Sequence, residues 1–211
     1  MKLFYSIIIL LLSTSAYAGE LRIVAHRGAS QEAPQNTMPA FKLAWKQGAD
    51  AIEGDFHLTK DGHIVCIHDK DTKSVANTNL VISKSTLAEL RKVDVGVRKD
   101  KASEGVIIPT IAEVFSTIPD KKTVYIEIKC DTEIIPTLLE EIDDSGLTGD
   151  QIVVISFKSK VLKELKERAP DLKVAWLCAF KKDKTSGITT PSLETVLETL
   201  KLIKADAISS N

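Results

Sequence analysis

The feature that most constrains this chain is an alternation of short β-branched runs with segments of helical periodicity. Runs rich in Val and Ile and bounded by Gly, Pro or Asp are typical of buried strands. We expect strands at residues 21–24, 49–58, 64–68, 123–129, 151–157, 172–177 and 205–209. Helical patterns occupy residues 38–47, 132–144, 160–168 and 190–204. Repeated strand–helix units predict parallel strands with helices packed outside the sheet.

Two α/β architectures fit this order of elements: a TIM (β/α)8-type barrel and an open doubly wound sheet. A doubly wound sheet normally carries a glycine-rich phosphate loop after its first strand. Here residues 26–34 read His-Arg-Gly-Ala-Ser-Gln-Glu-Ala-Pro, without that pattern. The expected strands are one short of a closed eight-stranded barrel. The strand pattern by itself therefore leaves the choice open.

The chain has 211 residues and a formal net charge of −1, which fits one domain and gives no argument for a nucleic-acid partner. The first 18 residues differ from the rest. Lys2 precedes an apolar run at residues 3–12, and residues 16–18 fit a small-x-small cleavage pattern. The run is shorter than the roughly 20 residues that a membrane span needs. We expect a signal peptide cut after Ala18, export to the periplasm or outside the cell, and no stable membrane insertion after cleavage.

The three cysteines, Cys66, Cys130 and Cys178, are odd in number and widely spaced. This pattern is no disulfide framework and no zinc motif. They are either buried small hydrophobes, or one disulfide with one free thiol.

The connection at residues 70–108 is long for an α/β unit and contains a capping box at residues 86–89. Long connections with some structure of their own are often binding loops or lids. A solvated surface insertion explains the same pattern equally well.

Three carboxylates form a candidate metal site. Glu53 and Asp55 are two apart on one expected strand, so their side chains share a face. Two carboxylates that close repel each other unless a cation lies between them. Glu127, near the end of the strand at residues 123–129, is a third acid with matching placement. Oxygen-only ligands favour Ca²⁺ or Mg²⁺ over zinc. A solvated edge strand would also explain such a pair, although Ile52 and Phe56 indicate a buried strand.

Two histidines, His26 and His68, end expected strands near these acids. One imidazole can accept a proton while the other donates one, because both titrate near neutral pH. Either histidine alone would more often be structural. We interpret His57 and His63 as surface residues.

Arg27 and Lys129 add positive charge at the same strand ends. Arginine can bind a phosphate with two parallel hydrogen bonds, and lysine adds a point charge. Ordinary ion pairs with nearby carboxylates are the alternative. Taken together, the histidines, acids and cations indicate metal-dependent cleavage of a phosphate diester.

Several motifs, in this order, resemble those of the glycerophosphodiester phosphodiesterase family. Each is weak alone, but the ordered set covers residues 23–157. The motifs are Ala-His-Arg-Gly-Ala at 25–29, Pro-x-Asn-Thr at 34–37, Gly-Ala-Asp-x-Ile-Glu-x-Asp at 48–55, Thr-Lys-Asp-Gly at 59–62, Ile-His-Asp at 67–69 and Ile-Glu-Ile-Lys at 126–129.

The resemblance implies a TIM barrel that hydrolyses glycerophosphodiesters to glycerol 3-phosphate and an alcohol, with a Ca²⁺ or Mg²⁺ ion. It also implies a small substrate-side insertion, which would correspond to residues 70–108. Position by position, it implies His26 and His68 as the acid–base pair, Glu53, Asp55 and Glu127 as metal ligands, and Arg27 and Lys129 as phosphate contacts.

Two positions depart from the family pattern. The family usually has Glu where this chain has Gln35, which removes one charge near the site. The family also continues to a final strand with a Trp-Thr-Val type motif, which residues 205–211 lack. We therefore expect the domain at residues 19–211 to be a barrel truncated before its eighth strand.

Two other functions remain open from the sequence. The same barrel can act on lysophospholipids or other phosphodiesters, as a lysophospholipase D-type enzyme. The incomplete barrel also allows an inactive chain or a binding protein. The favoured partner is a small-molecule glycerophosphodiester.

Overall fold

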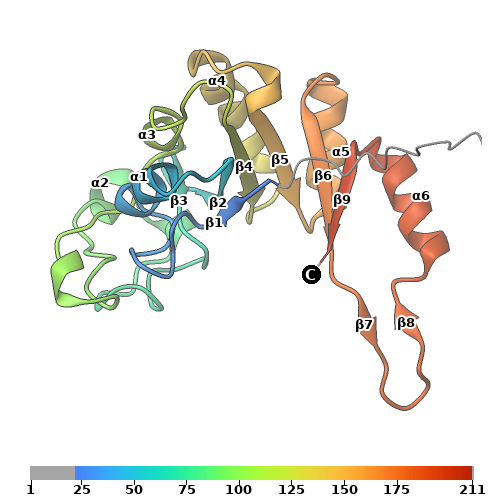
Figure 1. Ribbon diagram of the computed structural model, residues 1–211, viewed down its shortest axis with the longest axis horizontal. Coiled ribbons are helices and arrows are strands. Elements are labelled where there is room, and N and C mark those ends of the chain that lie inside the picture. The colour runs from blue at the N-terminus through green and yellow to red at the C-terminus, as the bar shows by residue number, and fades with distance from the viewer. Residues whose placement is uncertain (1–21, 211) are drawn as a thin grey trace, which may run out of the picture.

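A computed structural model describes residues 22–210 and places most of their strands in one mainly parallel sheet (Figure 1). The signal peptide predicted at residues 1–18 lies outside the described residues. Within residues 22–210, the first and last strands of the row end the sheet and do not pair with each other. The parallel row runs in the order β1 Val24–His26, β2 Ala51–Leu58, β4 Thr123–Ile128, β5 Ile152–Ser156, β6 Lys173–Cys178 and β9 Ala207–Ser210. This order is that of a partial TIM barrel.

The strand β3, Ile64–Cys66, lies outside the parallel row and pairs antiparallel with the second half of β2. A turn at residues 59–63 joins the two strands. Of the seven expected strands, β3 is therefore the antiparallel one, and the other six are parallel. A small ribbon of β7 Lys181–Lys182 and β8 Thr189–Thr190 was not expected. Its strands are two residues long, too short to produce a period in the sequence.

The helices follow the expected positions, with ends set by local chemistry. Ser192 caps the last helix by accepting a hydrogen bond from the Thr195 N–H, so this helix begins later than residue 190. Within residues 22–210, no helix is both long and apolar enough to cross a membrane. The α-helices are α1 Met38–Lys46, α2 Leu87–Leu90, α3 Ile111–Phe115, α4 Ile135–Asp144, α5 Ser159–Arg168 and α6 Leu193–Ile203, and the 3₁₀ turns are η1 Ile82–Lys84, η2 Lys101–Ser103, η3 Thr132–Ile134 and η4 Gly149–Gln151.

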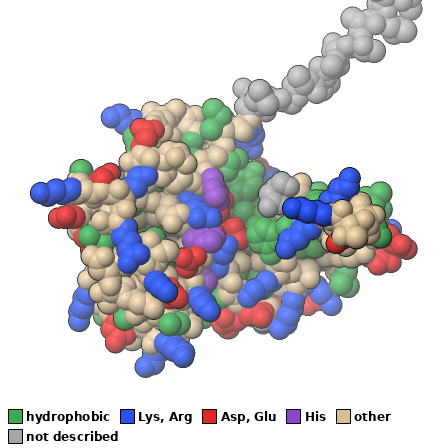
Figure 2. Space-filling view, turned by 90° about the horizontal axis from the view of Figure 1, so that it is seen from below, with side chains coloured by type: hydrophobic (Ala, Val, Ile, Leu, Met, Phe, Trp, Pro, Cys, Tyr) green, Lys and Arg blue, Asp and Glu red, His purple; other side chains and the backbone are tan. Residues whose placement is uncertain are grey.

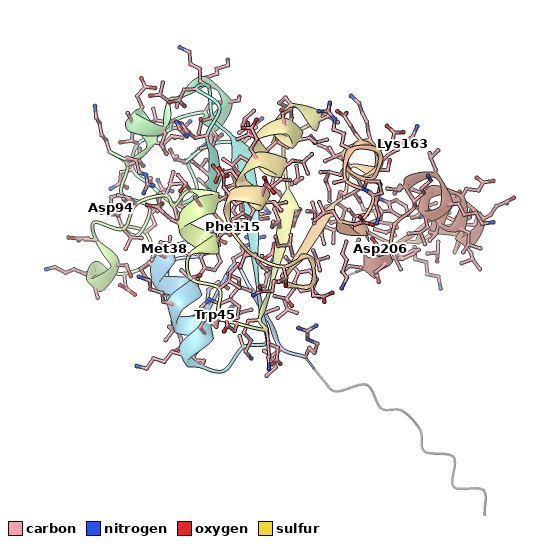
Figure 3. The ribbon with its side chains drawn as sticks, turned by 90° about the horizontal axis from the view of Figure 1, so that it is seen from above. Met38, Trp45, Asp94, Phe115, Lys163 and Asp206 are labelled. Carbon is pink, nitrogen blue, oxygen red and sulfur yellow. The ribbon has the colours of Figure 1, made fainter. Side chains whose placement is uncertain are left out.

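The main core lies between the sheet and its helices. Alternate strand residues point to opposite faces, and the even-numbered residues of β2 and β4 face the helices. Phe41 and Ala44 of α1 pack there, and Figure 3 shows α1 and α3 side by side, with Trp45 and Phe115 labelled. The strand residues in this core include Ile52, Phe56, Val124, Ile126, Ile128, Ile152, Val154 and Val174. The odd-numbered residues of β2 and β4 are therefore left for the opposite face, where the predicted site lies.

The long connection at residues 70–108 has a small core of its own. Ile82, Leu90, Val95 and Ile108 are buried there against Val65 of β3. This packing holds the connection beside the carboxyl end of β2, because β3 is hydrogen-bonded to β2. Residues 70–108 are thus a packed subdomain rather than a solvated excursion.

The three cysteines are free thiols in the structure. Cys66 and Cys178 are buried, and Cys130 is partly buried. The interpretation as small core residues fits this arrangement, and the alternative of a disulfide does not.

Candidate functional site

Strand register assembles the predicted site at the carboxyl ends of the first strands. In the pairing of β1 with β2, His26 lies opposite Glu53. In the pairing of β2 with β4, Asp55 lies opposite Glu127. Because facing residues of neighbouring strands point to the same side, all four side chains lie on the inner face.

The structure brings the three predicted metal ligands together. Carboxylate oxygens of Glu53, Asp55 and Glu127 lie within 4.8 Å of one another. All three side chains are buried, with residue exposures of 5%, 0% and 8%. Burial and the nearby Asp55 carboxylate raise the pKa of Glu53 to about 8, and burial also raises the pKa of Glu127. Such crowding of buried acids is unfavourable without a compensating cation.

Two oxygens of this cluster identify where a cation would fit. Within the part of the chain that the structure describes, Glu53 Oε1 and Asp55 Oδ1 are buried without a hydrogen-bond donor. Buried polar atoms normally have hydrogen-bond partners, so two such carboxylate oxygens in one cluster are candidate ligands of an ion, although Lys129 Nζ also lies 3.4 Å from Asp55 Oδ1. An all-oxygen donor set suits Ca²⁺ or Mg²⁺. The residues present therefore fit a divalent metal ion.

The two predicted phosphate contacts, Arg27 and Lys129, lie against the acids. Arg27 Nε is 3.1 Å from Asp55 Oδ2, and Lys129 Nζ is 3.4 Å from Asp55 Oδ1 and 2.8 Å from Glu127 Oε1. The main-chain N–H of Arg27 also donates to Glu53 Oε2 at 2.9 Å. Both cations thus border the cluster, where they can face an anionic substrate.

Asn36 holds Asp55 in place, a role that sequence reasoning did not assign. Its Nδ2 donates to Asp55 Oδ2 at 2.8 Å, and its Oδ1 accepts the Asp55 main-chain N–H at 3.1 Å. Asn36 is buried and has a positive φ of 60°, a backbone region that asparagine tolerates better than most residues. The signal was its place in the Pro-x-Asn-Thr motif, but only the fold shows its partner.

His68 is oriented by its neighbour Asp69. His68 Nδ1 lies 2.7 Å from Asp69 Oδ1. A hydrogen bond from Ser74 and the adjacent His68 lower the pKa of Asp69, so this carboxylate is an acceptor near neutral pH. A carboxylate acceptor at this position favours the imidazole proton on Nδ1, and Nε2 is then the ring nitrogen available for a substrate.

His26 lies at the end of β1, opposite Glu53 of β2. Its Nε2 is 3.9 Å from Glu53 Oε2, and its side chain is 67% exposed. Partial desolvation and the adjacent Arg27 lower the pKa of His26. Figure 2 shows histidines gathered with acidic and basic side chains on this face.

The interpretation of His57 as a surface residue was wrong, whereas His63 is exposed as expected. His57 is 8% exposed, and its Nε2 lies 3.2 Å from the carbonyl oxygen of His68. The physical reason is the strand period: His57 is two residues after Asp55, so it lies on the same inner face. Its contact supports the main chain at His68.

Gln35, where the family usually has Glu, contacts the site through Arg27. Arg27 Nη1 donates to Gln35 Oε1 at 2.7 Å. A neutral partner leaves more of the guanidinium charge for other anions. The replacement of Glu by Gln35 therefore affects the partner of Arg27, whereas the three carboxylates of the proposed metal site are those of the family.

The raised pKa of Glu53 predicts a pH effect on stability in chelator-treated protein. The folded pKa of about 8 lies above the ordinary value of 4.5, so the native state binds more protons between these values. The contribution of Glu53 to stability should therefore fall as pH rises through this window, by at most about 1.4 kcal/mol per pH unit. Urea denaturation at pH 6 to 8, compared with Glu53→Gln, measures this slope. Equal slopes in the two proteins would contradict it.

Comparisons with known proteins agree with this geometry. A profile of the Glycerophosphoryl diester phosphodiesterase family matches residues 26–210. A glycerophosphodiester phosphodiesterase of Caldanaerobacter subterraneus subsp. tengcongensis is 39% identical over 160 residues, which are 74% of this chain and 65% of that protein. A glycerophosphodiester phosphodiesterase of Bacillus subtilis is 30% identical over 189 residues, which are 82% of this chain and 64% of that protein.

Known structures have the same fold. An Oleispira antarctica phosphodiesterase in complex with the product sn-glycerol-3-phosphate matches with a TM-score of 0.80 and 26% identity, over 90% of this chain and 74% of that chain. A glycerophosphodiester phosphodiesterase from Thermotoga maritima matches with a TM-score of 0.70 and 28% identity, over 91% and 74% of the two chains. This chain spans slightly less than two thirds of the length of the two curated relatives named above.

Proposed function

Because the chain belongs to the glycerophosphoryl diester phosphodiesterase family, we propose that it hydrolyses glycerophosphodiesters to sn-glycerol 3-phosphate and an alcohol. The observation that carries the proposal is the register of β1, β2 and β4, which joins three buried acids and His26 on one face. The product named for the Oleispira antarctica structure supports the choice of substrate class. The TIM-barrel fold predicted from the sequence is confirmed by the similarity to the Oleispira antarctica and Thermotoga maritima structures.

In this mechanism the substrate phosphate lies between Arg27 and Lys129, which balance its negative charge. A water oxygen forms a bond to phosphorus while the bond from phosphorus to the alcohol oxygen breaks. One of His26 and His68 accepts the proton of the water, and the other donates a proton to the departing alcohol oxygen. Asp69 keeps the imidazole of His68 in one orientation, and the carbonyl of His68 is held by His57.

A divalent cation held by Glu53, Asp55 and Glu127 would supply positive charge beside the phosphate. The buried oxygens Glu53 Oε1 and Asp55 Oδ1, which accept no hydrogen bond, support this assignment. Asn36 keeps the Asp55 carboxylate turned toward its neighbours, and its main-chain N–H donates to the Arg27 carbonyl oxygen at 3.0 Å. One asparagine thus orders both an acid and a cation of the site.

The test is release of sn-glycerol 3-phosphate from glycerophosphocholine and glycerophosphoglycerol, with and without excess EDTA. We expect turnover that EDTA removes and that Mg²⁺ or Ca²⁺ restores. Full turnover in EDTA would contradict the metal role and leave the hydrolysis in place. No release from either diester in the presence of both ions would contradict the proposed activity.

A further inference from the structure

A cavity of about 390 Å³ opens from His26 and Arg27 toward the insertion. One wall is the loop between β1 and α1, with Ser30 and Gln31, and the other is the segment around Arg98 and Lys99. Its size is in the range of small-molecule sites. Because it begins at predicted catalytic and phosphate-binding residues, it is placed to receive one arm of a phosphodiester.

The segment that carries Arg98 and Lys99 is held in a defined shape. Asp94 accepts hydrogen bonds from the main-chain N–H groups of Gly96 at 2.9 Å, Val97 at 3.1 Å and Gly105 at 2.8 Å. A Cβ on Gly96 would lie 1.8 Å from the carbonyl oxygen of Ser103, so only glycine fits there. Figure 3 labels Asp94 in this segment, on the same side of the molecule as Met38 of α1.

Lys99 ties this segment to the opposite wall of the cavity. Its Nζ donates to the carbonyl oxygens of Ser30 at 3.0 Å and Gln31 at 2.7 Å. These carbonyls are neutral, so the ammonium keeps its net charge. The insertion and the β1–α1 loop are therefore joined across the cavity, with positive charge between them.

The cavity wall is cationic and has no group that recognises a cation. Arg27, Arg98 and Lys99 line it, and none of its described lining residues is Asp, Glu, Phe, Tyr or Trp. Arg27 pairs with Asp55, but no carboxylate among residues 22–210 lies within 4.0 Å of the Arg98 guanidinium. Quaternary ammonium groups are typically bound by aromatic faces. Choline is therefore a poor match for this wall.

The second opening of the site has a different character. A cavity of about 420 Å³ beyond His68 and Lys129 is lined by both Asp69 and Asp71 as well as Lys70. Mixed charges suit a neutral polyol such as glycerol, which the proposed substrates share. The cationic cavity is then left for the alcohol that differs between substrates.

We propose that the cavity between Arg27 and Arg98 binds the leaving alcohol and selects diesters whose alcohol carries an anionic group. This specificity rests on the proposed function. Arg98 is its main determinant, because it lines the cavity and no carboxylate among residues 22–210 lies within ion-pair distance of it. A phosphate on the alcohol would meet the guanidinium in a charge-assisted hydrogen bond.

The experiment compares three substrates of the full chain with Mg²⁺ present. They are glycerophosphocholine, glycerophosphoglycerol and the deacylated diphosphate glycerol–phosphate–glycerol–phosphate–glycerol, whose leaving alcohol carries a second phosphate. The readout is kcat/KM for release of sn-glycerol 3-phosphate by the native protein and by Arg98→Glu. The matched control is Lys101→Glu, which makes the same change of charge at an exposed cation of the same segment that does not line the cavity.

We expect the native protein to prefer the diphosphate over glycerophosphocholine by about tenfold, and salt to reduce this ratio. Arg98→Glu should lower the ratio by about tenfold or more, whereas Lys101→Glu should leave it within about twofold of the native ratio. Equal kcat/KM for the three substrates, or an unchanged ratio in Arg98→Glu, would overturn the specificity and leave the proposed hydrolysis intact. No release from any substrate would overturn the proposed hydrolysis and the specificity with it.

Discussion

Replacing His68 or His26 with alanine is expected to lower kcat for glycerophosphodiester hydrolysis by about 100- to 10,000-fold. Each imidazole is proposed to transfer one proton during cleavage. The proposed mechanism has no other side chain that performs either transfer. His68 is held by Asp69 at 2.7 Å, and His26 lies 3.9 Å from the acid cluster. Steady-state release of sn-glycerol 3-phosphate measures the loss, which should be in kcat rather than KM because proton transfer belongs to the transition state.

The control for these variants is His63→Ala. His63 is exposed and lies 4.0 Å from Asp61 at the turn between β2 and β3, outside the acid cluster. Its replacement should leave kcat within about twofold, as is usual for a surface residue. The double variant of His26 and His68 should lose less than the product of the single losses, since the two act in one reaction. A kcat above a tenth of the native value in either single variant would contradict the two-histidine mechanism.

The sequence predicted the parts of the site that depend on local periodicity. The two-residue spacing of Glu53 and Asp55 put them on one face, and the strand ends located His26 and Glu127. These predictions worked because a strand fixes side-chain direction from residue to residue. The same rule places His57, two residues after Asp55, on the inner face. The prediction for His57 was wrong because the rule was misapplied at that position.

The remaining features depend on contacts between distant segments. Asn36 and Asp55 are 19 residues apart and meet only once α1 packs on β2. Lys99 and Ser30 are 69 residues apart and meet only because the insertion folds back over the β1–α1 loop. Predicting that β3 runs antiparallel to β2 would also have required the geometry of the turn at residues 59–63. Local sequence patterns do not specify which distant segments come into contact. The cationic cavity, which is formed by two such segments, could therefore not be predicted from the sequence.

Asp55→Asn and Glu53→Gln should both abolish most activity, with kcat falling by at least about 100-fold. Each removes one carboxylate of the proposed metal site and keeps the size of the side chain. We expect the loss to persist at saturating Mg²⁺ if the altered residue also orders the site, and to be partly restored if only affinity has changed. Isothermal titration with Mg²⁺ or Ca²⁺ should show weaker binding in both variants.

The two variants should differ in stability, because the native protein treats the two acids differently. Asp55 lies fully buried between Arg27 at 3.1 Å and Lys129 at 3.4 Å, so its neutralisation leaves two partly buried cations without their shared partner. The expected cost is about 3 kcal/mol. Glu53 has a pKa raised to about 8 by burial and by Asp55, so its charged form is already disfavoured in the fold. Replacing it with glutamine should therefore preserve or increase stability at pH 8.

Urea denaturation of the native protein and both variants, in EDTA at pH 8, separates these expectations. Asp55→Asn should unfold at a clearly lower urea concentration, and Glu53→Gln at the same or a higher one, with similar slopes. Loss of activity without loss of stability in Glu53→Gln would assign this acid to function alone. If Glu53→Gln were instead the less stable of the two, the Glu53 carboxylate would have to be a favourable ion-pair partner in the metal-free fold. The division of roles between two acids of one strand would then be reversed.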